Sequence, residues 1–359
     1  MSAQTEPRRW HAIHAYHHER DLDPLLLNAV RPLFQQLWPV LPDRSFRPHW
    51  KLGPHLRVHV RATDREFEEL VWPAAQEWIG GYLRDHPSTT VLDPAEFLPR
   101  HRELARKEKE TGPLEPWPPN NTLRVEPYDP RVEALGNAEA SELLARFSAA
   151  VTPLLFTMIA DTPDRGSRTR LCFRLMAALC QALPPGGLAR TFISLRSHSE
   201  SLLTSAPEGA RLRREWDRYY TGHRTSLAEE LDAVLAGVDG TASPPPHLTE
   251  WVEALRTAWR EAAELLERGI PPAPALTPGG LRTMEHSPLH RAIAESPAEG
   301  ELREDWFTLF RVVLNCTYLT VTRLGLSPLE RLSLCHLLAN TAEHRYGRTA
   351  FDVIAAGDL

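Results

Sequence analysis

The sequence predicts an α+β fold, in which an antiparallel sheet in the N-terminal part packs with a larger, helical C-terminal part. Early in the chain, short stretches alternate between apolar and polar residues, as half-buried strands do. After Pro130, longer stretches repeat apolar residues at helical spacing and are separated by proline-rich linkers. We therefore expect one domain over residues 1–359, with a sheet-containing part (1–126) and a mainly helical part (127–359).

The predicted elements follow one another in a simple order. The strands are residues 10–16, the HLRVHV stretch within 46–60, residues 121–126, and a short strand at 89–92. The helices are residues 22–38, 66–83, 138–160, 168–183, 211–220 and 248–267. Strand, helix and strand in this order favour an antiparallel sheet backed by helices.

The HLRVHV strand has two chemically different faces. Its leucine and two valines point one way, while Arg57, His59 and Arg61 point the other. A face with two arginines and a histidine either meets solvent or lines an anionic or polar pocket.

Composition excludes several classes of protein. With 42% hydrophobic and 25% charged residues, the chain is ordinary for a soluble globular protein. A net charge of −6 gives no electrostatic basis for general nucleic-acid binding. The opening MSAQTEPRR lacks the apolar core of a signal peptide, and no apolar run is long enough to span a membrane. We expect a cytoplasmic protein without membrane contact.

Neither the cysteines nor the histidines predict a metal site. The cysteines Cys172, Cys180, Cys316 and Cys335 lie in apolar surroundings and form no CxxC pair, so buried free thiols are expected. The histidines within residues 11–18 mix both faces of a predicted strand and cannot converge on one ion. The expected metal content is none.

The stretch 312–328 near the C-terminus predicts a buried helix that Gly325 closes, with Pro328 just beyond as a stop signal. It carries polar groups that are unusual in a plain core helix. Asn315, Tyr318 and Thr322 are spaced to share one face, and Arg323 lies one position round from them. If this face is buried, its polar groups need partners, because unpaired polar groups are costly in a core. Those partners are either neighbouring protein groups or a ligand.

A second polar candidate lies at Ser287, which is followed by Pro288. This pair predicts a helix N-cap with proline in the first turn. The alternative is that Ser287 presents its hydroxyl, or the new helix its free amides, to a substrate backbone.

Three stretches, in the same order as in a known family, carry a resemblance. YLTVTRLG, registered on Arg323, resembles the HMHxNRLxG signature of the glutamate-elimination domain of class I lantibiotic dehydratases. FRPHWKLGPHLRVHVR resembles that family's RYxxxxPHLRLR strand, and VEPYDPRVEALGN resembles its TYEPExxRYGG segment. The resemblance implies the fold of that elimination domain for the whole of residues 1–359.

The departures from this family point to a different reaction. Tyr318 replaces the first histidine of the signature, Ala134 replaces the arginine before YGG, and His59 replaces the second arginine of the strand. A glutamate eliminase without these groups should not function as one. Stand-alone proteins with such losses resemble the pyridine synthases of thiopeptide biosynthesis, of the thiomuracin type.

This resemblance implies an enzyme that catalyses a formal [4+2] aza-cycloaddition between two dehydroalanines of a leader-bearing, azole-containing peptide. Loss of water and of the leader peptide then leaves a pyridine and a macrocycle. No cofactor is expected. The expected partners are the precursor peptide and other enzymes of thiopeptide biosynthesis, with no nucleic acid.

The resemblance also assigns roles to residues of this chain. Tyr318 is expected to be a proton donor, with Ser287 and Arg323 as further catalytic groups, Arg323 orienting the site. The expected substrate contacts are Arg57, His59, His55, Asn315 and Thr322. Two other readings stay open, namely glutamate elimination from glutamylated serine or threonine, and a non-catalytic module that binds a leader peptide.

Overall fold

The computed structural model of the protein describes residues 6–274, 287–296, 300 and 304–357. The chain forms two compact units. The sheet unit comprises Met1–Asp161 and Thr322–Gly325, and the helical unit comprises Thr162–Val321 and Leu326–Leu359. The sheet-containing part was predicted to end at residue 126. The sheet unit extends beyond this residue, because helices that follow it in the chain contact an edge strand of the sheet.

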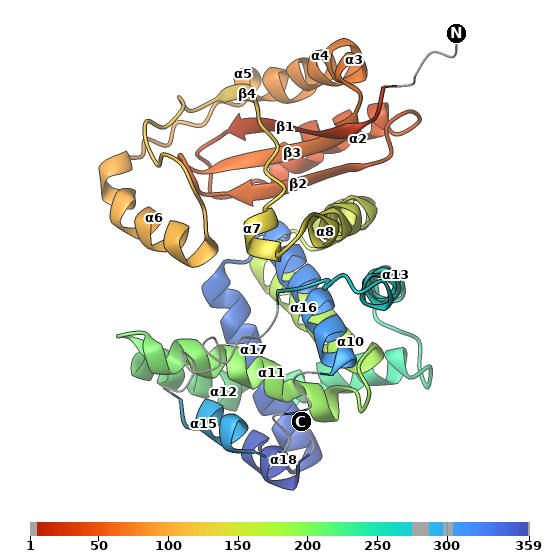
Figure 1. Ribbon diagram of the computed structural model, residues 1–359. Helices are drawn as coiled ribbons and strands as arrows, with labels where there is room; N and C mark the ends of the chain where they lie inside the picture. The colour runs from red at the N-terminus through yellow and green to blue at the C-terminus, as the bar shows by residue number, and fades with distance from the viewer. Residues whose placement is uncertain (1–5, 275–286, 297–299, 301–303, 358–359) are drawn as a thin grey trace. The chain divides into compact units, whose positions relative to one another are not determined.

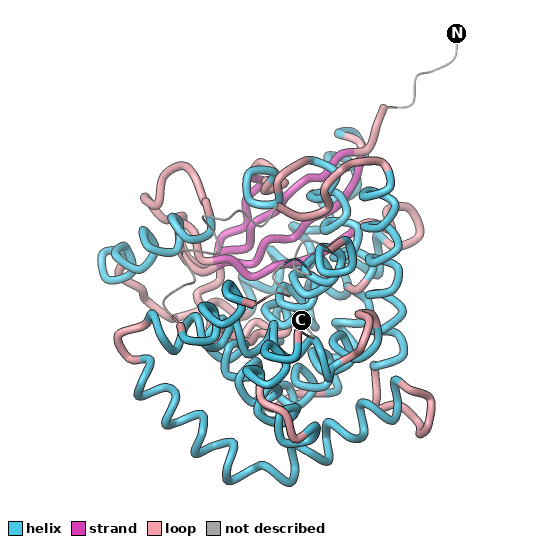
Figure 2. The backbone as a smooth tube through the Cα atoms, turned by 60° about the horizontal axis from the view of Figure 1, so that its bottom comes forward, coloured by secondary structure: helices cyan, strands magenta, loops and turns pink. Residues whose placement is uncertain are grey.

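A four-stranded antiparallel sheet organises the sheet unit (Figure 1). Its strands are β1 (Arg9–Tyr16), β2 (Arg44–His49), β3 (His55–Ala62) and β4 (Thr122–Glu126). Their spatial order is β2-β3-β1-β4, so β1 and β3 are central and β2 and β4 are the edges. The predicted fold class, with an antiparallel sheet in the N-terminal part and a mainly helical remainder, is confirmed (Figure 2).

Two details of the strand prediction differ from the structure. Strand β2 was not expected, because its sequence RSFRPH lacks regular alternation and contains Pro48. A proline is tolerated there since β2 is an edge strand. The short strand predicted at 89–92 is wrong. This segment is irregular, and its neighbourhood is held by side-chain amides, with Asn120 Nδ2 donating to the carbonyls of Ser88 and Thr90.

Two helical segments accompany the strands of the sheet unit. The first runs through α1 (Asp23–Leu25), a π-helical turn (Leu26–Val30) and α2 (Arg31–Leu37). The second runs through α3 (Asp64–Glu66), α4 (Trp72–Ala75) and α5 (Gly81–Asp85), joined by π-helical turns at Phe67–Val71 and Gln76–Gly80. The ring of Phe67 stacks on His11 of β1, which places this second segment on the apolar face of the sheet.

The remaining helices of this unit follow in order. They are α6 (Pro94–Glu108), α7 (Val132–Leu135), α8 (Ala138–Ala150) and α9 (Thr152–Asp161). The single helix predicted over 138–160 is therefore divided at Val151, just before Pro153. Helices α8 and α9 both contact the edge strand β2.

The helical unit contains eight described helices. They are α10 (Arg165–Ala182), α11 (Leu188–Ser205), α12 (Gly209–Val238), α13 (Leu248–Glu267), α15 (Pro288–Glu295), α16 (Asp305–Arg323), α17 (Pro328–Tyr346) and α18 (Ala350–Ala356). All four cysteines are free and buried, as predicted. Among the described residues, no single helix is long and apolar enough to cross a membrane, although the bent pair α8–α9 passes on length and composition.

Helix α16 ends as its sequence predicts. Gly325 adopts φ +85°, a conformation that favours glycine, and the N–H of Leu326 donates to the carbonyl of Val321. Helix α17 then starts at Pro328 with a capping box between Ser327 and Glu330. The last residues of α16, from Thr322, are grouped with the sheet unit.

Candidate active site

Tyr318 of α16 forms a hydrogen-bonded pair with a histidine 120 residues earlier in the chain. Its hydroxyl lies 2.6 Å from Nδ1 of His198 on α11. Sγ of Cys335, on α17, lies 3.3 Å from the same hydroxyl. The guanidinium of Arg331 covers the tyrosine ring at 4.5 Å from its centre. Three helices of the helical unit therefore meet at this phenol.

Both members of the Tyr318–His198 pair are neutral near pH 7. Burial, reinforced by the neighbouring Cys335, raises the pKa of Tyr318 well above its ordinary value. Burial and the charge of Arg331 lower the pKa of His198 to about 4. A neutral phenol can donate a proton and a neutral imidazole can accept one, so the pair can move protons without creating a buried ion.

Ser287 begins helix α15, which contacts the residue that precedes His198 in the chain. It is the N-cap of α15, and its Oγ accepts hydrogen bonds from the N–H groups of Leu289 and His290 at 3.2 and 3.5 Å. The predicted N-cap is confirmed. Nε2 of His290 lies 2.8 Å from Oγ of Ser197, the residue before His198. Because Ser287 uses Oγ as an acceptor in its cap bonds, its own proton can still be donated.

The polar face predicted on α16 is less buried than its spacing suggested. Asn315 is exposed, so water can satisfy its amide, and Tyr318 and Thr322 are half-buried. The proposed substrate contacts of Asn315 and Thr322 stay predictions.

Arg323 is buried at the end of α16, inside the sheet unit. It donates to the carbonyl of Ser148 at 3.0 Å and to Oγ1 of Thr152 at 2.6 Å, and it lies over the ring of Phe46 at 4.7 Å. Burial and the charge of Arg47 lower its pKa to about 9. Within the sheet unit, these contacts hold the last residues of α16 to Ser148, Thr152 and Phe46. An orienting role for Arg323 in catalysis stays a prediction.

Within the sheet unit, the three predicted residues of β3 share the polar face of the sheet. His55 and Arg57 are buried and His59 is half-buried. Arg57 Nε donates to Nε2 of His55 at 3.2 Å, and Nδ1 of His55 lies 2.9 Å from the carbonyl oxygen of Gly53. Burial and the charge of Arg57 lower the pKa of His55 to about 3, and burial with Arg47 and Arg57 lowers that of His59 strongly.

Neighbouring strands extend this polar face. In the register of the sheet, Arg47 of β2 lies opposite Arg57, Arg57 lies opposite His14 of β1, and His14 lies opposite Arg124 of β4. Since paired residues point to the same side of a sheet, these four residues form one row across all four strands. We call it the cationic row.

One group of side chains near this row has the composition of a metal site. The ligand atoms of His49, Glu108 and Glu110 lie within 4.8 Å of one another. However, Nδ1 of His49 accepts the N–H of Lys51 at 3.1 Å, so its proton is on Nε2, the atom that faces Glu110 at 3.4 Å. Lys51 and Arg131 are also 3.7 and 3.8 Å from Glu110. The protonated nitrogen and these cations disfavour a metal ion there.

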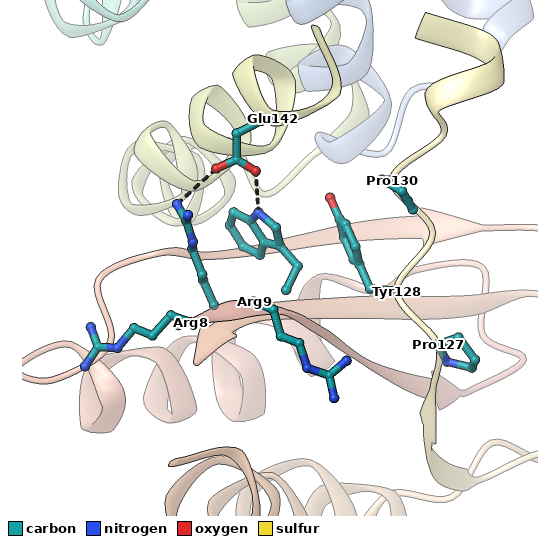
Figure 3. A pocket seen from close by; sticks show the side chains of 8 residues that line it. Arg8, Arg9, Pro127, Tyr128, Pro130 and Glu142 are labelled. Atoms are coloured by element: carbon teal, nitrogen blue, oxygen red, sulfur yellow. Dashed lines mark hydrogen bonds and ion pairs between the residues drawn. The ribbon is translucent and has the colours of Figure 1, made fainter. Parts of the chain in front are cut away.

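A cavity of about 470 Å³ opens at one end of the sheet, beside the irregular segment that follows β4 (Figure 3). Its walls include Pro127, Tyr128 and Pro130. Trp10 Nε1 and Arg61 both bond to the carboxylate of Glu142 on α8, at 3.0 Å each. A second cavity has a volume of about 410 Å³ and is lined by Lys51, Lys109, Glu110, Thr111, Asp129, Pro130, Arg131, Val132, Glu133 and Ala134.

Sequence reasoning missed the partners of these groups. His198, Ser197 and His290 reach the Tyr318 region from α11 and α15, and no local motif marks them. Arg47 was missed because β2 was missed. His14 was noticed only as part of a histidine cluster, since its position opposite Arg57 depends on strand register.

Comparison with known proteins identifies the family. The family model for lantibiotic biosynthesis dehydratase, C-terminal part, matches residues 10–342. This chain belongs to that family. No curated protein sequence matches it.

Solved structures agree with this assignment. The chain is similar to the pyridine synthase TbtD from thiomuracin biosynthesis, with 35% sequence identity and a TM-score of 0.78 over 94% of this chain and 99% of that one. It is also similar to TsrL, with 19% identity and a TM-score of 0.73 over 97% and 98% of the two chains. The second likeness supports the fold alone. The resemblance to thiopeptide pyridine synthases is thereby confirmed.

Proposed function

We propose that this protein is a cofactor-independent pyridine synthase of thiopeptide biosynthesis, of the lyase type. The observation that carries the proposal is its 35% identity, over nearly its whole length, to a pyridine synthase from thiomuracin biosynthesis. The neutral Tyr318–His198 pair supports it independently, because the proposed reaction needs proton transfer but no buried ion. The replacement of the family's histidine by Tyr318 argues against glutamate elimination.

The substrate would be a leader-bearing, azole-containing peptide with two dehydroalanines. One dehydroalanine and its preceding amide, as the imidic-acid tautomer, form the azadiene, and the second dehydroalanine is the dienophile. Ring closure forms two carbon–carbon bonds, because both ends of the azadiene and both ends of the dienophile are carbon atoms, and the amide nitrogen is already an internal atom of the azadiene. Loss of water and then of the leader as a carboxamide makes the ring aromatic. A folded site that holds the two alkenes close together lowers the entropic cost of bringing them into contact.

The Tyr318–His198 pair would catalyse the tautomerisation of the reacting amide. Nε2 of His198 takes the amide N–H proton, and Nδ1–H passes its own proton to the Tyr318 oxygen. Tyr318 then gives its hydroxyl proton to the amide oxygen. Each group ends neutral, and His198 has exchanged one tautomer for the other. The same phenol can later protonate the departing hydroxyl group.

Other groups would bind and orient the peptide. Ser287, one helix away from the pair, would donate to a substrate carbonyl, and Arg57 and His59 would hold further carbonyls. Arg323 would orient the end of α16 through its bonds to α8 and α9. The leader-bearing precursor is the proposed partner, and the cytoplasm the proposed location.

Mass spectrometry tests this function. The purified protein is mixed with a leader-bearing, azole-containing, doubly dehydrated peptide. We expect free leader carboxamide and a macrocycle lighter than the substrate by the leader carboxamide and one water. An unchanged substrate that co-elutes with the protein would instead support a peptide-binding module. In a parallel reaction with a glutamylated precursor peptide, conversion of glutamylated serine to dehydroalanine would support glutamate elimination.

A further inference from the structure

The cationic row is an unfavourable arrangement for a folded sheet. Arg47 and Arg57 lie directly opposite each other on neighbouring strands. Like charges in directly opposed positions destabilise a sheet, and burial increases the cost of each charge. Burial and the charges of Arg57 and Arg131 lower the pKa of Arg47 to about 10.

Neither arginine has a carboxylate of its own within the part of the chain that the structure describes. Arg57 makes a single hydrogen bond, through Nε to His55, and Arg47 makes no hydrogen bond or ion pair. The buried carboxylate nearby, Glu110, is within ion-pair distance of Lys51 and Arg131 instead. The two guanidinium groups therefore retain donors that the protein does not use.

A third group of the cationic row also has a polar atom without a hydrogen-bond partner among the described residues. Next in the row is His14, which is 8% exposed and whose Nδ1 has no hydrogen-bond partner among the described residues. Its ring stacks on His55 at 4.6 Å. A buried, unpartnered imidazole beside two arginines without carboxylates indicates a missing polar ligand.

We propose that Arg47 and Arg57 form a carboxylate-binding subsite for the substrate peptide. This inference rests on the proposed function for the identity of the peptide. It deepens that proposal by giving Arg57 a carboxylate of the peptide to bind in place of a carbonyl. A guanidinium presents its donors as a planar fork that matches a carboxylate. An acidic side chain of the leader and the C-terminal carboxylate of the core peptide share this chemistry.

The first experiment uses a small probe and does not depend on ring formation. Acetyl-aspartate amide and acetyl-asparagine amide differ only in the side-chain carboxylate. We expect the first, but not the second, to raise the melting temperature of the wild-type protein, and Arg47→Gln to abolish the increase. Equal responses to the two compounds would overturn the proposal.

Arg124→Gln is the matched control. It removes the same charge from the same row, but Arg124 is exposed and lies outside the proposed subsite. Without ligand, Arg47→Gln should have a higher melting temperature than the wild type, because it removes a desolvated charge that faces Arg57. Weaker binding combined with greater stability cannot come from misfolding. A carboxylate response in Arg47→Gln equal to that of Arg124→Gln would contradict the proposal.

The two sources of carboxylate are then separated with labelled substrate peptides. In one peptide, the acidic residues of the leader become amides. In another, the C-terminus of the core is an amide. We expect one of the two changes to weaken binding about tenfold or more in fluorescence anisotropy, and Arg47→Gln to remove that difference. Retained affinity for both peptides would overturn the proposal, whereas failure of the proposed function would appear separately, as an unchanged substrate in mass spectrometry.

Discussion

The Tyr318–His198 pair and the cationic row use titratable groups in opposite ways. In the helical unit, a phenol and an imidazole are joined at 2.6 Å, and burial keeps both neutral. In the sheet unit, the buried Arg57 and the half-buried Arg47 keep their charge without a carboxylate partner among the described residues. The pair contains both a proton donor and a proton acceptor, whereas the arginines of the row are hydrogen-bond donors without a carboxylate acceptor among the described residues. The difference indicates chemistry at the first region and ligand recognition at the second.

The largest expected effect comes from removing the phenol. Tyr318→Phe deletes the proton donor and keeps the ring under Arg331, so ring formation should fall about 100-fold or more. Leader binding, measured by anisotropy, should not change. Tyr220→Phe is the control, because Tyr220 also uses its hydroxyl in the helical unit, to bond the carbonyl of Asn340. A similar rate for Tyr318→Phe and Tyr220→Phe would break the distinction between the two regions.

Replacing the partner of the phenol should have a smaller effect. His198→Asn can still hydrogen-bond the Tyr318 hydroxyl but cannot accept a proton as imidazole does. We expect ring formation to fall roughly 10- to 100-fold, mainly in kcat, since substrate contacts are preserved. A change confined to KM would assign His198 to substrate binding instead.

The sheet unit should be sensitive to acid. The pKa of His14 is lowered to about 2 and that of His55 to about 3, mainly by burial. Both are below the ordinary value, so the unfolded state binds more protons and stability falls as the pH drops below about 6.5. Each histidine should remove about 1.4 kcal/mol per pH unit in this range.

Urea unfolding at pH 7 and pH 5 measures this loss. The variant His55→Asn should show a smaller difference between the two pH values than the wild type. Equal stability at both pH values in the wild type would mean that these histidines are not neutral and buried in the folded protein.

The smallest expected effect comes from replacing Ser287, and it distinguishes helix capping from contact with the substrate. Ser287→Ala removes the cap of α15 and should cost about 1 kcal/mol of stability. Ser287→Asn keeps a capping acceptor but removes the hydroxyl. If the hydroxyl contacts substrate, both variants should lose activity while only the alanine variant loses the cap, as seen by thermal unfolding. Full activity of Ser287→Asn would leave Ser287 with the capping role alone.

The sequence was sufficient for the fold class and for several elements, because alternation and helical spacing are local signals. Helices α6, α11, α17 and α18 were not predicted. Strand β2 could not be predicted in this way, because it contains Pro48 and lacks regular alternation of apolar and polar residues. Ser287 was correctly expected to cap a helix, because capping is also local. The partners of Tyr318 and Arg57 could not be predicted from local patterns. His198 is 120 residues from Tyr318 in the chain, and Arg47 lies opposite Arg57 only because of the strand register. Burial was overestimated on α16, where periodicity places Asn315 on a polar face but cannot say whether water reaches it.

The measurement that bears most directly on the Tyr318–His198 pair is the pH dependence of ring formation. With the pKa of His198 at about 4 and that of Tyr318 well above its ordinary value, neither group changes charge near neutral pH. We therefore predict that kcat/KM is flat from about pH 6.5 to 9. An apparent pKa near 7 that disappears in His198→Asn would show that a charged histidine takes part, and would contradict catalysis by a neutral pair.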